Sequence, residues 1–379
     1  GKYVMYRLKP TNSRWMKKIV AGVVLGVLTV SFVWGQNFEV SRDEFGMPNF
    51  NGQWNFNDTT PFERPINYGK QEFLTTSEFE SKINNEADLE ERRDSREQGL
   101  SERVVNIPTG NPGAYNNFWS YYQDNFPNQR TSILVSPKNG RLPIKAESEV
   151  QLSPPHANGC NTGQVVPLLR PVRISFGAIT CDRPEDFGLA SRCLLFPQTT
   201  GPYIKANSYN NNIRIVVTAG YVVLYSELGN DPRIVPLGKR PHLDKRQKTW
   251  TGNSFGYWEQ DVLVIETKDF VPQMASVFMR NKAIGSAANM HLIERFSLVD
   301  NDSMAYEFTI KDKVAFGEDV RGITHFARMS EAIFEFACHE GNYAMGNVLR
   351  GARLLEREWR EKEALVNEET LEVSAGGSG

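Results

Sequence analysis

The segment WTGNSFGYWEQDVLVIET (residues 250–267) indicates the fold of this chain, because it reads as two β-strands joined by a tight turn. Aromatic and β-branched residues fill Phe255–Glu259 and Val262–Thr267, and only Gln260-Asp261 separates them. A two-residue link between strand-forming segments of this length predicts a β-hairpin.

Segments of the same kind flank this hairpin on both sides. They are Ile213–Thr218, Tyr221–Leu228, Arg233–Leu237, Asn289–Val299, Met304–Ile310, Ile323–Met329 and Ala332–Cys338. Short links such as Ala219-Gly220 predict an antiparallel meander. With so many strands in succession, a closed or nearly closed barrel is the simplest way to remove the sheet edges. The predicted fold class is therefore mainly β, with a lipocalin-like barrel over residues 201–345.

The remaining parts of the chain predict less regular structure. In the N-terminal arm (36–105), Thr75-Thr76-Ser77-Glu78 has the form of a capping box. It opens a charged segment that predicts one or two solvated helices, held by a stripe of three apolar residues, Phe79, Ile83 and Leu89. Residues 106–200 predict long loops with one strand near Thr131–Val135. Residues 346–379 predict a helix and a flexible tail.

The predicted C-terminal helix covers Asn347–Asn367. Its apolar residues lie on one face, which predicts that it plugs or buttresses the barrel. These residues are Val348, Ala352, Leu355 and Trp359.

The first 35 residues predict export. Lys17 and Lys18 precede the uncharged, mostly apolar run Ile19–Trp34, and Val33-Trp34-Gly35 supplies a cleavage site before Gln36. The alternative is a retained membrane anchor, although the run is shorter than the ~20 residues that a spanning helix needs. We expect a periplasmic or secreted protein, in contact with a membrane only if this segment is retained.

Cysteine usage agrees with export. The chain has four cysteines, and in an oxidising compartment an even number favours disulfides. Three pairings of the four cysteines are possible, and we favour Cys160–Cys181 with Cys193–Cys338. No C-x-x-C spacing favours zinc. Lysine and arginine total 43 against 45 aspartates and glutamates; this near balance offers no basic surface for nucleic acid, so no nucleic-acid partner is expected.

The order of short motifs resembles a bacterial exported protein family of unknown function. The main motif is W-x-G-x-S-x-G-x-W-E-x-D-x-L-V-x-E-T at 250–267, and C-H-E-G-N-Y at 338–343 is the last. Further blocks are Thr60–Pro65, Arg130–Ser132, Tyr209–Asn212 and Arg240–His242. Gln260 stands where the family pattern has glycine, which puts the turn type in question but not the strand pairing. The resemblance implies a grouping and no activity.

Strand parity suggests where chemistry lies, because residues two apart share a face. Three strands each place one glutamate, Glu227, Glu266 or Glu294, on an otherwise apolar or aromatic face. A carboxylate inside a barrel needs a partner or takes up a proton. The candidate partners are Arg214, Arg233 and Arg328. The result is either a buried network that fixes the strands or the polar floor of a cavity.

Other candidate sites are less specific. His291, His325 and His339 fall on separate strands, and a three-histidine metal site is not favoured, so no metal and no cofactor are expected. Ser254 lies in a G-x-S-x-G pattern, but without a strand–turn–helix setting a β-turn explains it better than a nucleophile elbow. The aromatic clusters Tyr115–Tyr122 and Phe255–Trp258 either fill a core or line a cavity mouth.

Three functions follow from these observations. The first is binding of an apolar or aromatic small molecule inside the barrel, with Glu227, Glu266, Tyr257, Trp258 and His339 as ligand-binding residues. The second is a cofactor-free lyase, isomerase or hydrolase in the same cavity. It would use Glu294 or His291 for acid–base chemistry and Arg295 to hold an anion. The third is an accessory subunit of a cell-envelope complex. The oligomeric state does not follow from the sequence.

Overall fold

The computed structural model describes residues 38–101, 128–145, 192–196, 203–206, 209–229, 231–238, 247–272, 274–279, 282–343 and most positions of 345–365. All the elements below belong to the compact unit Val40–Gly379. The signal-like run, the pair Cys160–Cys181, the block Arg240–His242 and the cluster Tyr115–Tyr122 lie outside these residues. None of the described helices has the length and apolar composition needed to cross a bilayer.

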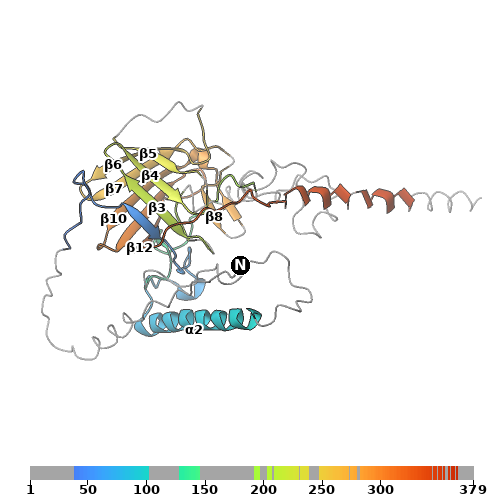
Figure 1. Cartoon of the computed structure of the whole chain (residues 1–379), viewed down its shortest axis with the longest axis horizontal. Coiled ribbons are helices and arrows are strands. Elements are labelled where there is room, and N and C mark those ends of the chain that lie inside the picture. The colour runs from blue at the N-terminus through green and yellow to red at the C-terminus, as the bar shows by residue number, and fades with distance from the viewer. Residues whose placement is uncertain are drawn as a thin grey trace, which may run out of the picture. The chain divides into compact units, whose positions relative to one another are not determined.

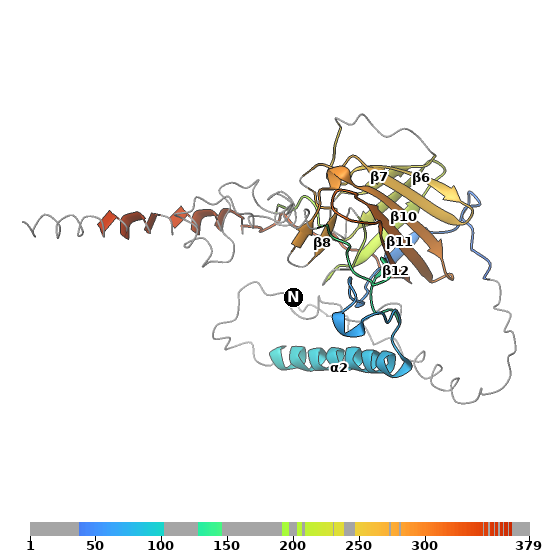
Figure 2. The same ribbon diagram turned by 180° about the vertical axis from the view of Figure 1, so that it is seen from behind.

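The mainly β prediction is confirmed. Nine strands form one antiparallel, nearly closed barrel in the order β5-β4-β3-β1-β12-β11-β10-β7-β6. Figure 1 shows β3, β4 and β5 toward the viewer, and Figure 2 shows β7, β10, β11 and β12 on the opposite side. The bounds are β1 Gly52–Asn55, β3 Asn212–Val217, β4 Tyr221–Ser226, β5 Arg233–Pro236, β6 Asn253–Glu259, β7 Val262–Lys268, β10 His291–Leu298, β11 Ser303–Lys311 and β12 Val320–Met329.

The barrel closes where β5 meets β6. An odd number of alternating strands leaves its first and last strands parallel, and the bridge between Leu237 and Gly256 is parallel. The Gly238 amide donates to the Gly256 carbonyl at 2.7 Å. A Cβ at Gly256 would lie 3.2 Å from Leu237 and 3.3 Å from Val235. Glycine therefore permits the close approach of the two edges.

Two short strands outside residues 201–345 join the barrel: β1 comes from a segment with no predicted strand, and β2 confirms the strand predicted near Thr131–Val135. β1 lies between β3 and β12, so the barrel is not confined to residues 201–345. β2 (Leu134–Ser136) also pairs with β12, but further toward its start, opposite Arg321 and Gly322. β12 thus changes partner from β2 to β1 along its length. A separate hairpin joins β8 (Val277–Met279) and β9 (Lys282–Ile284).

Aromatic side chains fill the barrel interior. Tyr306 packs against Phe296 and Phe326 with ring centroids 5.0 and 5.3 Å apart, and Tyr203 stacks on Phe308 at 4.7 Å. All five are at most 1% exposed. Phe50 and Trp258 stack at one end of the barrel, with centroids 5.8 Å apart.

The charged segment forms one helix, α2 (Thr76–Ser101). The predicted capping box is confirmed: the Thr75 amide donates to Glu78 Oε2 at 2.8 Å, and the Glu78 amide donates to Thr75 Oγ1 at 3.3 Å. Phe79 and Ile83 are half-buried. The described positions between 345 and 365 are helical, but the four residues of the predicted apolar face are outside the described set.

Three local predictions are wrong or need correction. Ala332–Cys338 forms no strand, and none of the described strands pairs with it. Ser254 lies within β6 rather than in a turn, and its hydroxyl is 2.8 Å from Thr267 Oγ1 on β7. The predicted strand Asn289–Val299 begins only at His291, after the 3-10 turn η5 (Ala287–Asn289).

The disulfide Cys193–Cys338 is present and confirms that predicted pair. It ties the short described segment 192–196 to the chain that follows β12. The rings of Phe196 and Phe336 meet edge to face beside it, with centroids 5.2 Å apart.

Candidate functional site

Glu294 is the one predicted glutamate that points from a strand into the barrel. It is 0% exposed and forms a very short ion pair with Arg233 of β5, one of its predicted partners. The Tyr306 hydroxyl donates to Glu294 Oε1 at 2.8 Å and accepts from the Ile204 amide at 2.9 Å. The carboxylate is therefore matched by a cation and a hydroxyl from two other strands.

This network is sealed from solvent. Burial raises the pKa of Tyr306 well above its usual value, and the nearby negative charge of Glu294 adds to the effect. Phe296, Phe308 and Phe326 surround the tyrosine ring. No substrate reaches Glu294 without displacing these side chains, so the arrangement holds strands β5, β10 and β11 together.

Glu266 and His291 lie on the outer face of the barrel, contrary to the predicted inward placement of Glu266. Glu266 accepts the Tyr257 hydroxyl at 2.9 Å, and His291 Nε2 lies 2.9 Å from its other oxygen. On the same face Arg295 pairs with Glu259 at 2.8 Å. On β7 the residues of the opposite parity, Leu263 and Ile265, belong to the hydrophobic core, whereas Val264, which shares the face of Glu266, is buried but is not part of that core.

Three residues on the outer face, Tyr257, Glu266 and His291, have shifted pKa values. Burial and the charge of Lys268 lower the pKa of His291, against the opposing influence of Glu266. Burial alone would raise the pKa of Glu266, but its hydrogen bonds with Tyr257 and His291 lower it overall. Burial and Glu266 raise the pKa of Tyr257 to about 12. A neutral His291 on β10 therefore donates from Nε2 to the carboxylate of Glu266 on the neighbouring strand β7.

The predicted catalytic residues do not converge. Glu294 points inward from β10, whereas His291 and Arg295, at odd separations from it, point outward. An acid–base pair formed by Glu294 and His291 would have to act through the wall of the barrel. The two carboxylates Glu294 and Glu266 are separated in the same way.

The other predicted ligand-binding residues are also dispersed. Glu227 follows β4, is 5% exposed, and accepts from Asn212 Nδ2 and from the Phe334 amide. Trp258 packs on Phe50 at the barrel end. His339 is exposed beyond the last strand. These residues form no common cavity.

Arg214 and Arg328, the other two candidate partners, pair with none of the three glutamates in the described part of the chain. Arg214 is exposed on β3. Arg328 lies over the Trp54 ring at 4.2 Å and donates to the carbonyls of Asn49, Asn51 and Asn301. It therefore ties the chain segment before β1 to the end of β12.

A cleft of about 620 Å³ lies outside the barrel, along the first half of α2. We call it the α2 cleft. Three parts of the sequence form it: the segment after β1, the helix with the residues that precede it, and the segment before β2. Its lining residues are Thr59, Pro61, Tyr68, Leu74, Ser77, Glu78, Ser81, Lys82, Asn85, Glu86, Arg130 and Thr131.

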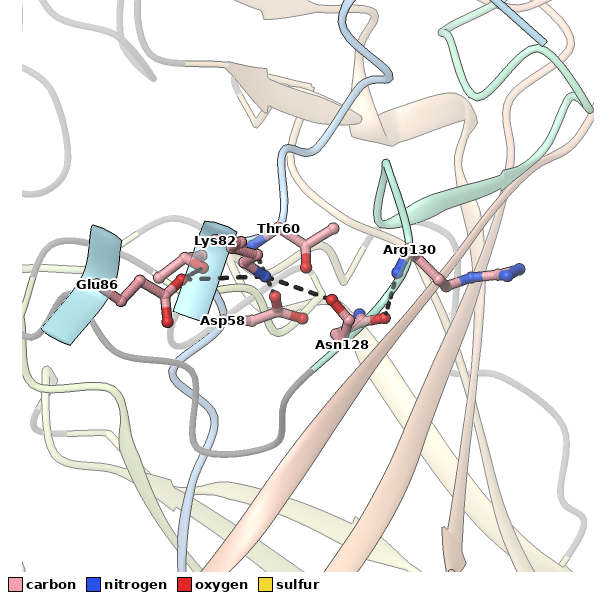
Figure 3. A network of polar contacts seen from close by, with 7 residues as sticks. Asp58, Thr60, Lys82, Glu86, Asn128 and Arg130 are labelled. Carbon is pink, nitrogen blue, oxygen red and sulfur yellow. Dashed lines mark hydrogen bonds and ion pairs between the residues drawn. The ribbon is translucent and has the colours of Figure 1, made fainter. Parts of the chain in front are cut away.

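Lys82, one of the lining residues, connects α2 to the loop segment before β2. Figure 3 shows its ammonium group directed toward Asp58, Glu86 and Asn128. Lys82 Nζ lies 3.4 Å from the Asn128 carbonyl and 4.0 Å from Glu86 Oε1, and the Thr59 hydroxyl donates to Glu86 at 2.6 Å. One turn of the helix is thus fixed to both loop segments.

Two buried polar groups next to the lining residues of the cleft lack partners within the part of the chain that the structure describes. Asn128 Oδ1 accepts the Arg130 amide at 2.9 Å, which leaves Nδ2 as an unpaired donor. The Thr60 hydroxyl is also unpaired. Asn128 is 5% exposed and Thr60 is 4% exposed. Buried donors are normally paired, and these two groups are among the exceptions in the described residues.

The gap between β1 and β2 on β12 leaves room for Asp58, which comes close to two residues of β12. The Thr324 hydroxyl donates to Asp58 Oδ2 at 2.8 Å. His325 follows on the same strand, and burial lowers its pKa while the charge of Asp58 opposes that change. Because β12 has neither β1 nor β2 beside it here, side chains take the place of a strand partner.

The α2 cleft was not predicted, because the candidate residues were those expected inside the barrel. A usable signal was present in the sequence. The capping box at 75–78 and the blocks Thr60–Pro65 and Arg130–Ser132 all meet here: Pro61 accepts the Ile133 amide at 2.8 Å, and Arg64 Nε donates to Thr131 Oγ1 at 3.0 Å.

Within the described residues, no three His, Cys, Asp or Glu side chains gather in a metal-binding arrangement. His291, His325 and His339 belong to three separate environments. Comparison with protein-family models, with curated proteins and with solved structures finds no match for this chain.

Proposed function

We propose that this exported β-barrel protein binds a small organic molecule in the α2 cleft. The observation that carries the proposal is a preformed cleft between α2 and two loop segments, with two buried, unpaired polar groups, Asn128 Nδ2 and the Thr60 hydroxyl, next to its lining residues. Its volume falls within the range of small-molecule sites, roughly 300–1,000 Å³. In this proposal the barrel is a rigid scaffold, and the ligand lies against its outside.

The ligand in this proposal is not an apolar molecule inside the barrel. Tyr203, Phe296, Tyr306, Phe308 and Phe326 occupy the interior and are at most 1% exposed. A ligand there would have to displace closely packed rings, with a loss of contacts that binding would first have to replace. The α2 cleft requires no such rearrangement.

The enzyme alternative receives no support from the arrangement of its predicted residues, because Glu294 is separated from His291 and Arg295 by the barrel wall. For the envelope-subunit alternative, the filled barrel is the one favourable observation. Export itself is part of the proposal. Its support is the disulfide Cys193–Cys338, a bond typical of oxidising compartments.

Filling the cleft tests the proposed function. Asn85→Trp places a bulky ring on the lining surface, and Asn84→Trp is the matched control, because Asn84 is an exposed neighbour on the same helix that is absent from the lining. A library of small-molecule fragments is screened against the full chain by ligand-observed NMR.

We expect a set of fragments whose signals persist with Asn84→Trp and disappear with Asn85→Trp. The same two variants should have similar thermal unfolding, since both positions are exposed. Fragment signals that are equal in both variants, or no signals in the wild type, would show that the α2 cleft is not a binding site.

A further inference from the structure

Building on the proposed function, we infer that the ligand of the α2 cleft is a neutral, hydroxyl-rich ring compound, such as a mono- or disaccharide. Three features of the cleft lead to this class: its charges are already paired or committed, its accessible polar groups are uncharged, and an apolar surface lies among them.

The charged side chains of the cleft are engaged with one another or with the backbone. Glu78 Oε2 accepts from the Thr75 amide, the Thr75 hydroxyl and Gln71 Nε2, all at 2.8 Å. The hydrogen bond from the Thr75 amide is the main cause that lowers the pKa of Glu78. Lys82 and Glu86 face each other. A charged ligand would therefore have to compete with existing partners.

The guanidinium group of Arg130, the second cation of the lining, is engaged by an aromatic ring. It lies over the Phe73 ring, 4.8 Å from the centroid, and Figure 3 shows it pointing away from Lys82 and Glu86. With two cations and two carboxylates among the lining residues, the formal charges also cancel. The cleft thus has no excess charge to attract an anion or a cation.

The groups that remain available are hydroxyls and an amide. Ser77, Ser81 and Asn85 are exposed and follow each other at intervals of four residues along α2, so they lie on one face of the helix. Each can both donate and accept. Hydroxyl groups on a ligand need this combination, because each of them also donates and accepts.

Apolar groups accompany this polar row. Tyr68 and Leu74 are half-buried, and Pro61 is exposed beside them. A sugar ring carries hydroxyls at its edge and C–H groups on its faces. The lining therefore suits a ring that sets one face on Tyr68 and directs its hydroxyls toward Ser81 and Asn85.

Matched sugars that differ in charge test whether the cleft prefers an uncharged ligand. Glucose, glucuronate and glucosamine have the same ring but are neutral, anionic and cationic at neutral pH, and cellobiose is a larger neutral probe. Binding to the full chain is measured by saturation-transfer NMR and by calorimetry. We expect the two neutral probes to bind, and each charged probe to bind at least about tenfold more weakly than glucose, since a charge gains no uncommitted partner.

A pair of alanine variants locates the site. Asn85→Ala removes an amide from the lining and should weaken cellobiose binding about three- to tenfold, the effect of one or two hydrogen bonds. Asn84→Ala is the control and should leave it unchanged. Both are exposed substitutions on one helix, so loss of folding does not explain a difference.

The possible results distinguish the inferred ligand class from the proposed function. Charged probes or apolar fragments that bind more tightly than the neutral sugars, yet respond to Asn85→Trp, overturn the ligand class and leave the proposed function standing. Sugar binding that is equal in Asn84→Ala and Asn85→Ala places the sugar elsewhere and overturns the inference. The absence of any probe or fragment that responds to Asn85→Trp overturns both.

Discussion

Replacing Glu294 with glutamine should strongly destabilise the protein without removing ligand binding. The substitution keeps the shape of the side chain but removes the charge that faces Arg233. The two side chains are 0% and 8% exposed, so water replaces almost none of the lost interaction. An arginine left in this position without its partner costs roughly 3–5 kcal/mol.

The remaining contacts do not recover this loss. Glutamine retains one oxygen for the Tyr306 hydroxyl, now 2.8 Å from Glu294, but its amide group then faces the guanidinium with a second set of donors. We therefore expect a decrease in the free energy of unfolding of about 3–5 kcal/mol, measured by urea denaturation at neutral pH.

Two comparisons make the result specific. Glu266→Gln makes the same change on the outer face, where Glu266 is 20% exposed and its partner His291 is 24% exposed; it should cost about 1 kcal/mol or less. Replacing both Arg233 and Glu294 by apolar residues should be less damaging than Glu294→Gln alone, because no buried charge is left.

The reasoning would be refuted by a Glu294→Gln protein whose unfolding free energy lies within about 0.5 kcal/mol of the wild type, the range of ordinary surface substitutions. If such a protein also lost binding of the fragments or sugars, Glu294 would belong to a ligand site inside the barrel, and the placement of the site in the α2 cleft would be wrong.

Four further predictions concern the fold and its export. Gln260 has a φ of 54° at the first position of the β6–β7 turn, so Gln260→Gly should raise the unfolding free energy in urea by up to about 1 kcal/mol; a decrease would contradict this account of the turn. A Cβ at Gly322 would lie 2.2 Å from the Phe308 ring, so Gly322→Ala should lower stability by about 3 kcal/mol or prevent folding, whereas Gly317→Ala, whose nearest atom would be 3.7 Å away, should not. Folded Tyr306 keeps its proton above pH 10 while the unfolded chain loses it, so stability should fall as the pH rises beyond about 10, and Tyr306→Phe should reduce this fall in alkaline denaturation curves. N-terminal sequencing of protein from its natural host should begin near Gln36; a chain that retains Ile19–Trp34 would support the anchored form.

The turn at Gln260 illustrates what local sequence was able to predict. Strand propensity and a two-residue link were enough to place the β6–β7 hairpin, and the pairing of Glu259 with Val262 is the one expected. The capping box at Thr75 and Glu78 was equally local. Such features depend on residues within a few positions of each other, so their energies can be assessed without the rest of the chain.

The sequence did not show which face of each strand points into the barrel, although the alternation of side chains between the two faces was clear. Parity shows that Val262, Val264 and Glu266 share a face, but not whether that face is inside. In β7 the inner face belongs to Leu263, Ile265 and Thr267, because the neighbouring strands and the bridge that closes the barrel set the direction of the pleat. Both faces of this strand carry apolar residues, so composition alone did not decide between them.

The α2 cleft depended most on tertiary structure. β1 is only four residues long and joins the sheet between strands that are far away in the sequence, which leaves part of β12 without a strand partner. Thr59, Lys82 and Asn128 meet beside that gap from three separate segments. The sequence by itself predicted most of the strands and the helix cap, and it favoured the pairing of Cys193 with Cys338 among three possibilities. Long-range pairing decided which faces are buried and where a cleft forms, because these depend on contacts between residues that no local pattern connects.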